Sequence, residues 1–257
     1  MHKSTNSHFL KSKHQIIFGR HPVVDAIKEG QPVDKVLLLQ GTRGELEKEL
    51  RLLCREKLIP ITMTPKAKLD KLTFNKNHQG VIAFISPVRF YQIEDMIPHI
   101  FEKGETPLFL ILDGVTDTRN FGAISRSAEI FGVHAIIVPL KGSAQIGADA
   151  VKTSAGALLK VPVCKVKSLN NTIELLQNSG IQVFASSLEV ETPIQKLDFK
   201  APVAIVLGAE DLGVTTGVLR NSDQTFIIPQ IGSTDSLNVS VSAGVMLYEV
   251  QRQRKLG

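Results

Sequence analysis

Three short polar segments hold the residues of this chain that are best suited to chemistry. The first, residues 113–126, contains Asn120 and Arg126. The planar guanidinium of an arginine can bind a phosphate through two N–H groups. The two residues lie six positions apart, nearly two helical turns, so they need not share one face of a helix. The alternative interpretation is that Arg126 is a surface residue in a salt bridge.

The second segment, residues 207–213, combines two glycines with a carboxylate. Gly208 and Gly213 bracket a tight loop after an apolar strand, and glycine lets backbone approach a ligand closely. Glu210 can accept hydrogen bonds from nearby backbone and so shape the loop. An ordinary turn between a strand and a helix would have the same composition.

The third segment, residues 228–240, runs from an apolar strand end through Gly232 into a helix. Ser236 and Asn238 can cap this helix, which would leave backbone N–H groups directed at a ligand. The following apolar positions have helical spacing with one buried face: Val239, Ala243, Met246, Leu247 and Val250. An ordinary capped helix is the alternative.

The second half of the chain alternates apolar strands with helices. This pattern predicts a parallel sheet covered on both faces, in which ligands bind outside the carboxyl ends of the strands. The three polar segments follow predicted strands, so we expect them at that edge. The predicted strands are 108–112, 135–138, 162–166, 182–185, 203–207 and 226–228, and the predicted helices are 121–131, 149–159, 169–177 and 216–221.

The first half predicts a separate, smaller α/β domain. Residues 1–14 hold three Lys, three His and no acid, which predicts a flexible basic arm or a disordered leader without function. Residues 15–87 predict the small domain, and residues 88–106 a charged linker containing a helix through Ile93, Met96, Ile97 and Ile100. Residues 107–257 form the second domain.

Composition excludes several classes of protein. The net charge of +5 and the pI near 9.2 favour a nucleic acid over an acidic protein as the partner. No apolar run approaches the roughly 20 residues of a membrane span, and no targeting segment is evident, which favours the cytoplasm.

The cysteines and glycines exclude further kinds of site. Cys54 and Cys164 are far apart in apolar surroundings, so we expect core residues and no metal site. None of the glycines is spaced as Gly-x-Gly, which argues against a dinucleotide fingerprint and hence against an oxidoreductase.

Taken together, the three segments resemble the three motifs of the SPOUT superfamily, and more closely those of its TrmH-type ribose 2′-O-methyltransferases. The resemblance covers about residues 108–254. The motifs are Asn120-Phe121-Gly122 with Arg126, then Gly208-Ala209-Glu210 with Gly213, then Ile228-Pro229 with Ser236-Leu237-Asn238-Val239-Ser240. The part from Phe18-Gly19-Arg20-His21-Pro22-Val23 to Gly80-Val81 is similar to the L30e-like RNA-binding domain of RlmB-type 23S rRNA guanosine methyltransferases.

The resemblance implies a fold and an activity. It implies a C-terminal parallel sheet with a trefoil knot, a homodimer whose site uses residues from both subunits, and S-adenosylmethionine as the cofactor. The reaction would be methyl transfer to a ribose 2′-hydroxyl of RNA, with a guanosine of 23S rRNA as the expected target. A tRNA ribose methyltransferase is the alternative within the same class. A non-catalytic RNA-binding or ribosome-assembly factor is the alternative from a different class.

The resemblance also implies roles for individual residues. Arg126 would act at the hydroxyl, either as a neutral base or as a cation that positions RNA, with Asn120, Ser236 and Asn238 orienting it and the ribose. Arg20, His21 and Lys35 would contact RNA. Asp211 departs from the glycine usual after the motif glutamate and places an extra carboxylate beside the loop. The expected cofactor-binding residues are Leu207, Gly208, Glu210, Gly213, Ile228 and Leu237.

Overall fold

The structure, a computed structural model, describes residues 15–255. The predicted basic arm at residues 1–14 lies outside the described residues. The chain forms two compact units. One consists of the residues up to Pro87 together with Ile146–Ala148, and the other of Val88–Gln145 together with the residues from Asp149 onward. Each unit is described by itself below.

The first unit is a four-stranded sheet with helices on both faces. Its strand order is β1-β4-β2-β3, where β2 and β3 are parallel and β4 is antiparallel to β1 and β2. On one face α1 and α2 bury Ile27 and Leu50, and on the other α3 buries Leu69. The elements are β1 (Ile16–Phe18), α1 (Arg20–Lys28), β2 (Val33–Leu39), α2 (Glu45–Glu56), β3 (Ile61–Thr64), α3 (Lys66–Thr73) and β4 (Val81–Ile85).

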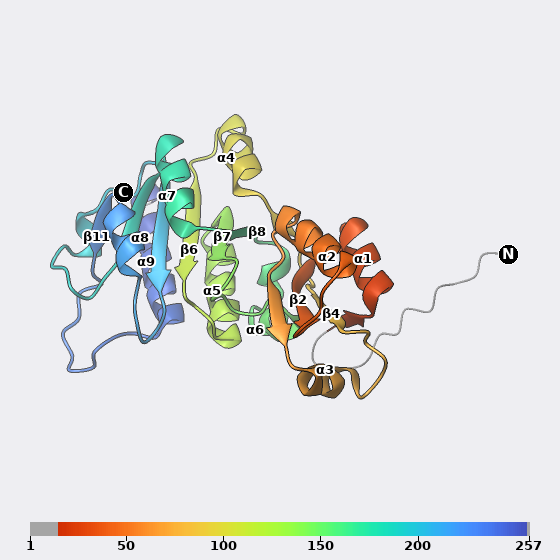
Figure 1. Cartoon of the computed structure of the whole chain (residues 1–257). Coiled ribbons are helices and arrows are strands. Elements are labelled where there is room, and N and C mark those ends of the chain that lie inside the picture. Colours follow the sequence, from red (N-terminus) through yellow and green to blue (C-terminus); the bar gives the residue numbers. More distant parts are fainter. Residues whose placement is uncertain (1–14, 256–257) are drawn as a thin grey trace. The chain divides into compact units, whose positions relative to one another are not determined.

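The second unit is built on a seven-stranded sheet in which every pairing is parallel. Its strands β6, β7, β8 and β11 are labelled in Figure 1. Its order, β11-β9-β10-β6-β7-β8-β5, places β6 and β10 side by side at the centre. The strands are β5 (Phe90–Tyr91), β6 (Leu108–Asp113), β7 (Ala135–Pro139), β8 (Val163–Val166), β9 (Gln182–Ser186), β10 (Val203–Gly208) and β11 (Gln224–Phe226). The predicted α/β fold with a parallel sheet is confirmed.

Helices cover both faces of this sheet. Phe109 and Ile111 of β6 belong to a core that also includes residues of α4, α7 and α8, and the alternate residues Leu108 and Leu110 are fully buried toward the other face. The helices α5 and α9 pack against each other. The helices are α4 (Ile93–Glu102), α5 (Thr118–Ile130), α6 (Ala148–Thr153), α7 (Leu169–Asn178), α8 (Thr216–Asn221) and α9 (Val239–Lys255).

Residues 88–106, expected as a linker, are built into the second unit. Phe90 and Tyr91 of β5 pair with β8 at the edge of the sheet. The helix predicted within this segment is α4, and its Ile93, Ile97 and Ile100 are buried in the core of the unit. The segment therefore belongs to the second domain, because its apolar residues are needed to cover that sheet.

Two boundaries differ from the predicted ones for local reasons. The helix predicted over 149–159 is interrupted at Ala155 and Gly156, whose φ angles of 51° and 84° are left-handed, so α6 ends at Thr153 and a 3-10 turn follows at Ala157–Leu159. The strand predicted over 226–228 pairs only through Phe226. Beyond it, Ile227 exchanges backbone hydrogen bonds with Thr192 and Ile194 instead.

Both cysteines are buried and unpaired, as predicted for core residues. Burial raises the pKa of the Cys54 and Cys164 thiols to about 12. Thiols of this kind stay protonated near neutral pH and are poor nucleophiles. We therefore assign them to packing alone.

Candidate active site

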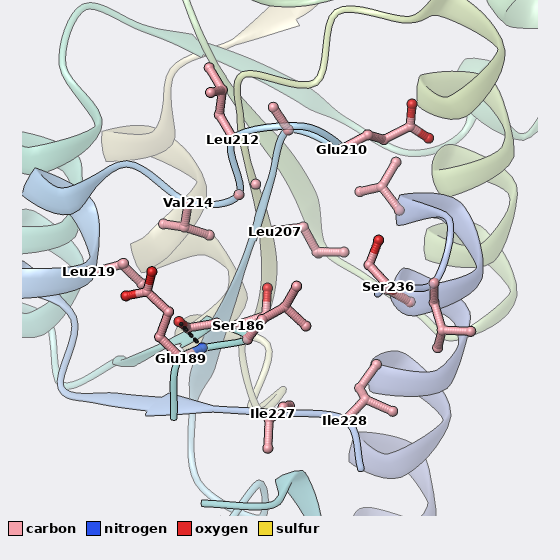
Figure 2. Close-up of a pocket in the computed structure, with 18 of the residues that line it drawn as sticks. Ser186, Glu189, Leu207, Glu210, Leu212, Val214, Leu219, Ile227, Ile228 and Ser236 are labelled. Atoms are coloured by element: carbon pink, nitrogen blue, oxygen red, sulfur yellow. Dashed lines mark hydrogen bonds between the residues drawn. The ribbon is translucent and has the colours of Figure 1, made fainter. Parts of the chain in front are cut away.

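A cavity of about 360 Å³ lies where β9, β10 and β11 end. Its walls combine apolar side chains with polar groups, most of which come from the loops that follow these strands (Figure 2). A site of this size and lining suits a small organic molecule with both apolar and polar groups. The apolar walls are Leu207, Val214, Leu219, Phe226, Ile227, Ile228, Leu237, Val239 and Met246.

The loop after β10 closes so tightly that glycine is required at its start. A Cβ atom at Gly208 would lie 1.9 Å from the carbonyl carbon of Gly213, far inside any tolerated contact. The N–H of Ala209 donates to the Gly213 carbonyl at 3.1 Å, and the N–H of Gly213 donates back to the Ala209 carbonyl at 2.9 Å. Gly213 itself has a φ of 66°. The glycines predicted to bracket a tight loop therefore do so.

The neighbouring strand β6 fixes the far end of this loop. Asp113, the last residue of β6, is only 7% exposed, and its Oδ2 accepts a hydrogen bond from the Thr215 N–H at 2.8 Å. Because Asp113 pairs in register with Gly208, this bond ties the start and the end of the loop to the same edge of the sheet. Sequence analysis included Asp113 only as the first residue of the segment 113–126, since its partner Thr215 is distant in the chain.

Glu210 joins the three polar segments in one hydrogen-bond network. Its Oε1 accepts hydrogen bonds from the Asn120 side-chain amide and from the Asn238 side-chain amide, both at 2.7 Å. Asn238 Nδ2 also lies 3.2 Å from Asn120 Oδ1, and Asn238 Oδ1 accepts the N–H of Ser240 at 2.9 Å. Charge-assisted bonds of this kind fix side chains more firmly than neutral ones.

Local sequence explains why Asn120 reaches this network. Asp117 caps α5, and its Oδ1 accepts the N–H groups of Arg119 and Asn120, both at 2.8 Å. The cap starts the helix at Thr118, earlier than predicted, and so presents Asn120 in its first turn. The network therefore depends on an ordinary helix start placed beside the end of β6.

The predicted residues divide into those that line the cavity and those that do not. Ser236 and all six expected cofactor-binding residues line it. Asn120 and Asn238 are linked to it through Glu210. Arg126 is exposed on α5 and is not among the lining residues within the described chain. The expected contact of Asn120 with Arg126 is not found among the described residues, where the Asn120 side chain is bonded to Glu210 and Asn238 instead.

The loop after β9 adds lining residues that sequence reasoning missed. Ser187 and Glu189 of this loop line the cavity together with Ser186 at the end of β9, and the N–H of Glu189 donates to the Ser187 hydroxyl at 3.2 Å. In Figure 2 Glu189 lies on one side of Leu207, with Glu210 and Ser236 on the other. The strand order would have revealed this loop, because β9 is the neighbour of β10. That order cannot be read from the sequence.

The cavity is acidic. Glu189, Glu210 and Asp211 line it, and no lysine, arginine or histidine does so within the described chain. A cationic ligand is therefore favoured over a neutral or anionic one. The described residues contain no group of three or more His, Cys, Asp or Glu able to hold a metal.

The three residues predicted to contact RNA lie in the first unit, but Lys35 does not share a cavity with the other two. Arg20 and His21 are exposed at the start of α1 and line a second, polar cavity. Lys35 is half-buried on β2, with its ammonium 4.7 Å from the centre of the Phe84 ring, and burial lowers its pKa. Lys35 does not line that cavity in the described structure.

No helix in the described part of the chain has the length and apolar character needed to cross a membrane.

Family models match both units. Residues 107–248 match the SpoU rRNA Methylase family, and residues 16–91 match the RNA 2′-O ribose methyltransferase substrate binding domain. The motif-based resemblance is therefore confirmed.

Named relatives cover nearly the whole chain. The 23S rRNA (guanosine-2′-O-)-methyltransferase RlmB of Photorhabdus laumondii is 38% identical over 241 residues, which are 93% of this chain and 98% of the relative. A putative TrmH family tRNA/rRNA methyltransferase of Staphylococcus saprophyticus is 35% identical over 93% of this chain and 96% of its own length.

A solved structure of a SpoU methyltransferase is similar to this chain over nearly its whole length. The SpoU methyltransferase AviRb of Streptomyces viridochromogenes, in complex with the cofactor AdoMet, matches with a TM-score of 0.60 and 25% identity, over 95% of this chain and 92% of that one. The chain therefore belongs to the SpoU rRNA methylase family of RNA 2′-O-ribose methyltransferases.

Proposed function

We propose that this protein transfers the methyl group of S-adenosylmethionine to the ribose 2′-hydroxyl of a guanosine in 23S rRNA. The observation that carries the proposal is the acidic, apolar-walled cavity, closed by the Gly208 loop and joined through Glu210 to Asn120 and Asn238. The RlmB relative, aligned over nearly its whole length, supports the choice of RNA and nucleotide. We place the reaction in the cytoplasm, with its RNA substrate.

The residues of the cavity fit the cofactor. The apolar walls suit the adenine ring, and the backbone of the loop from Gly208 to Gly213 can approach it, because no side chain intervenes at Gly208. The carboxylates of Glu189 and Asp211 complement the positive charges of the sulfonium and ammonium groups. When bound, S-adenosylmethionine supplies a methyl carbon already activated by positively charged sulfur.

Within the protein, we assign positioning to the polar network and RNA contact to Arg126. Glu210 holds the amides of Asn120 and Asn238 at fixed positions, so both motif segments keep one geometry relative to the cofactor loop. A guanidinium is a poor proton acceptor at neutral pH. Arg126 therefore holds the RNA beside the reacting hydroxyl as a cation, and alignment of oxygen, carbon and sulfur provides the main rate gain.

We further propose a homodimer that completes the site. Val241, Val245 and Tyr248 form an exposed apolar stripe along one face of α9, at helical spacing. Ile130 of the packed helix α5 is also exposed. A second copy of the chain is the occupant that the family resemblance implies. Because Arg126 lies on α5 but does not line its own cavity, the dimer would deliver it to the cavity of the partner subunit.

We also propose that the C-terminal residues form the trefoil knot implied by the resemblance, an exception to the unthreaded connections of most proteins. Helix α9, which follows the cavity loop, is the element that would pass through the chain. In support of this, α9 packs on α5, and Arg254 in its last turn donates to the carbonyls of Thr106 and Pro107.

A transfer assay tests the proposed function. Purified 23S rRNA, 16S rRNA and tRNA are offered separately with S-adenosylmethionine carrying a labelled methyl group. We expect label on 23S rRNA. Label on tRNA alone would favour the tRNA reaction, which the tRNA/rRNA names of other relatives leave open. Cofactor binding without transfer to any RNA would contradict the assigned substrates, and absence of cofactor binding would favour a non-catalytic RNA-binding protein.

A further inference from the structure

The methyl transfer proposed above releases a proton, and a group near the reacting atoms must accept it. A ribose hydroxyl that gained a methyl group and kept its proton would be an oxonium ion, a far stronger acid than a carboxylic acid. A carboxylate is therefore basic enough to take the proton while the bond to carbon forms, and a positioned acceptor raises a rate about 10²–10⁴-fold. Arg126 as a cation is not a candidate, because a charged guanidinium has no acceptor atom.

The lining of the cofactor cavity offers two kinds of proton acceptor. Among the described residues it contains no lysine, arginine or histidine. Its hydroxyl groups can pass a proton on but cannot hold one, whereas a carboxylate can. The hydroxyl groups belong to Ser186, Ser187, Thr216, Ser236 and Ser242, and the carboxylates to Glu189, Glu210 and Asp211.

Of the three carboxylates, Glu210 is the one bonded to the other polar segments. Its Oε1 accepts the side-chain amides of Asn120 and Asn238, both at 2.7 Å. The Glu189 and Asp211 carboxylates accept no hydrogen bond within the described part of the chain. In Figure 2 the Glu210 side chain lies on the side of Ser236, away from Glu189. Glu210 is therefore the carboxylate that the structure connects to both motif segments.

Both amides bond to the same oxygen of Glu210, which leaves its second oxygen open. Glu210 Oε2 takes part in no hydrogen bond or ion pair among the described residues. The residue is also exposed, so that a substrate can reach this oxygen. A carboxylate with one oxygen held and the other open can bind a hydroxyl without breaking the bonds that position it.

The two asparagines cannot reverse their amides, so the position of the carboxylate is well defined. Asn120 Oδ1 lies 3.2 Å from Asn238 Nδ2, and Asn238 Oδ1 accepts the N–H of Ser240 at 2.9 Å. With both oxygens engaged by donors, each Nδ2 must face Glu210. The backbone of Asn120 is fixed in turn by Asp117, whose Oδ1 accepts its N–H at 2.8 Å. Preorganisation of this kind is what a catalytic group requires.

We propose that Glu210 is a catalytic residue whose Oε2 accepts the proton of the ribose 2′-hydroxyl. The 2′ oxygen forms a bond to the methyl carbon, the bond from that carbon to sulfur breaks, and its electron pair stays on sulfur. The proton moves to Oε2 and passes to water after the products leave. One negative and one positive charge are neutralised together, so the cavity gains no net charge. The inference rests on the proposed function, because it names the proton acceptor of that reaction.

A binding comparison tests whether Glu210 faces the hydroxyl. The probes are an RNA fragment carrying the methylated nucleotide and the same fragment with a 2′-deoxyribose there, each with S-adenosylhomocysteine present so that no transfer occurs. We expect the unaltered protein to bind the ribose form about tenfold tighter, as a hydrogen bond to a charged acceptor provides. In Glu210→Ala the two Kd values should agree within about twofold. Equal binding by the unaltered protein, or a preference that survives in Glu210→Ala, would overturn the proposal.

Glu210→Gln separates proton transfer from positioning. The glutamine Oε1 can still accept both asparagine amides, but an NH2 group replaces the open oxygen and cannot take a proton. We expect the single-turnover rate to fall about 10²–10⁴-fold. The Kd values of cofactor and RNA, from calorimetry, should stay within about threefold. Glu174→Gln, on the exposed face of α7, is the matched control and should keep the full rate.

Chemical rescue gives an independent reading if Glu210→Gln disturbs the loop. Acetate and fluoroacetate are similar in size, but acetate is the stronger base. Added to Glu210→Ala at equal anion concentration, acetate should restore more transfer than fluoroacetate. Equal rescue by both, or a rate in Glu210→Gln within tenfold of the unaltered protein, would show that Glu210 only positions its neighbours. Absence of transfer by the unaltered protein would count against the proposed function itself, whereas these results would count against the proton acceptor alone.

Discussion

At the scale of single residues, we expect the carboxylates of Glu189 and Asp211 to influence which adenosyl ligand the proposed site prefers. Both line the cofactor cavity, and neither takes part in an ion pair among the described residues. S-adenosylmethionine carries a positive sulfonium that its product, S-adenosylhomocysteine, lacks. We therefore expect the acidic rim to favour the substrate form of the cofactor and to promote release of the product.

Glu189→Gln and Asp211→Asn should each raise the Kd of S-adenosylmethionine about 3- to 10-fold, the range for a charge interaction at a partly solvated site. The Kd of S-adenosylhomocysteine should rise by a smaller factor, because that ligand keeps the ammonium group but has no sulfonium charge. Calorimetry with both ligands measures the ratio. An equal loss for the two ligands would show that the carboxylates do not act on the sulfonium, but on the shared ammonium group or through the fold. Glu174→Gln, on the exposed face of α7, is the matched control.

A site residue could be predicted from the sequence where a short motif around it carries the signal. Gly208, Glu210, Gly213 and Asn238 carry their signal in short motifs, and the structure brings them to one place. Glu189 carries no such motif signal, because the loop that holds it joins the site only through the order of the strands in the sheet. The position of Arg126 outside the lining of the cavity was likewise hidden, since spacing along a helix does not show which cavity a side chain reaches.

At the scale of secondary-structure elements, the cofactor loop depends on the contact between Gly208 and Gly213. In Gly208→Ala the new Cβ would overlap the Gly213 backbone, so the loop must open. We expect cofactor binding to fall below detection in calorimetry while the circular dichroism spectrum stays close to that of the unaltered protein. Gly232→Ala is the matched control, because nothing lies within 4 Å of a Cβ there. Unchanged cofactor affinity in Gly208→Ala would contradict the assigned role of the loop.

Arg254 connects helix α9 to the rest of its unit through hydrogen bonds. This side chain donates to the carbonyls of Thr106, Pro107, Phe199 and Ala201 at 2.8–3.0 Å, and these precede β6 and β10. Burial lowers the pKa of its guanidinium, but the four carbonyl acceptors compensate for lost water.

Arg254→Ala should lower the free energy of unfolding by about 2–4 kcal/mol, because several partly buried carbonyls lose their donor at once. Urea denaturation followed by circular dichroism measures the change. Lys255→Ala, one residue further along on an exposed position, should have an effect within about 0.5 kcal/mol. Equal stabilities of the two variants would show that α9 is held by its apolar face alone.

Elements were predicted well where burial leaves a pattern in the sequence. The apolar runs of β6, β7 and β10 and the spacing of α9 mark their positions closely. Helix α3 was missed because within it only Leu69 and Thr73 are buried, which leaves little periodicity to detect. The role of residues 88–106 was misjudged because a charged segment with one apolar helix face reads as a linker until the sheet it covers is known.

At the scale of the whole molecule, the proposed dimer makes each active site a product of two chains. Arg126→Ala alone should abolish methyl transfer and leave cofactor affinity nearly intact, and Gly208→Ala alone should also be inactive. Mixing the two variants under conditions that exchange subunits should restore about a quarter of the activity, since half of the dimers then contain one complete site. Measurable transfer in the mixture, with none in either variant alone, is the expected outcome. No recovery despite proven exchange would place Arg126 and the cavity in the same subunit.

The most direct test of the central claim identifies the modified atom. 23S rRNA lacking the modification is incubated with the full-length protein and S-adenosylmethionine, digested to nucleosides, and analysed by mass spectrometry. We predict 2′-O-methylguanosine, at one site that resists alkaline hydrolysis, and its loss when Arg126→Ala replaces the unaltered protein. A methyl group on a base instead of a ribose, or no methylation of an RNA that the protein binds together with the cofactor, would contradict the account.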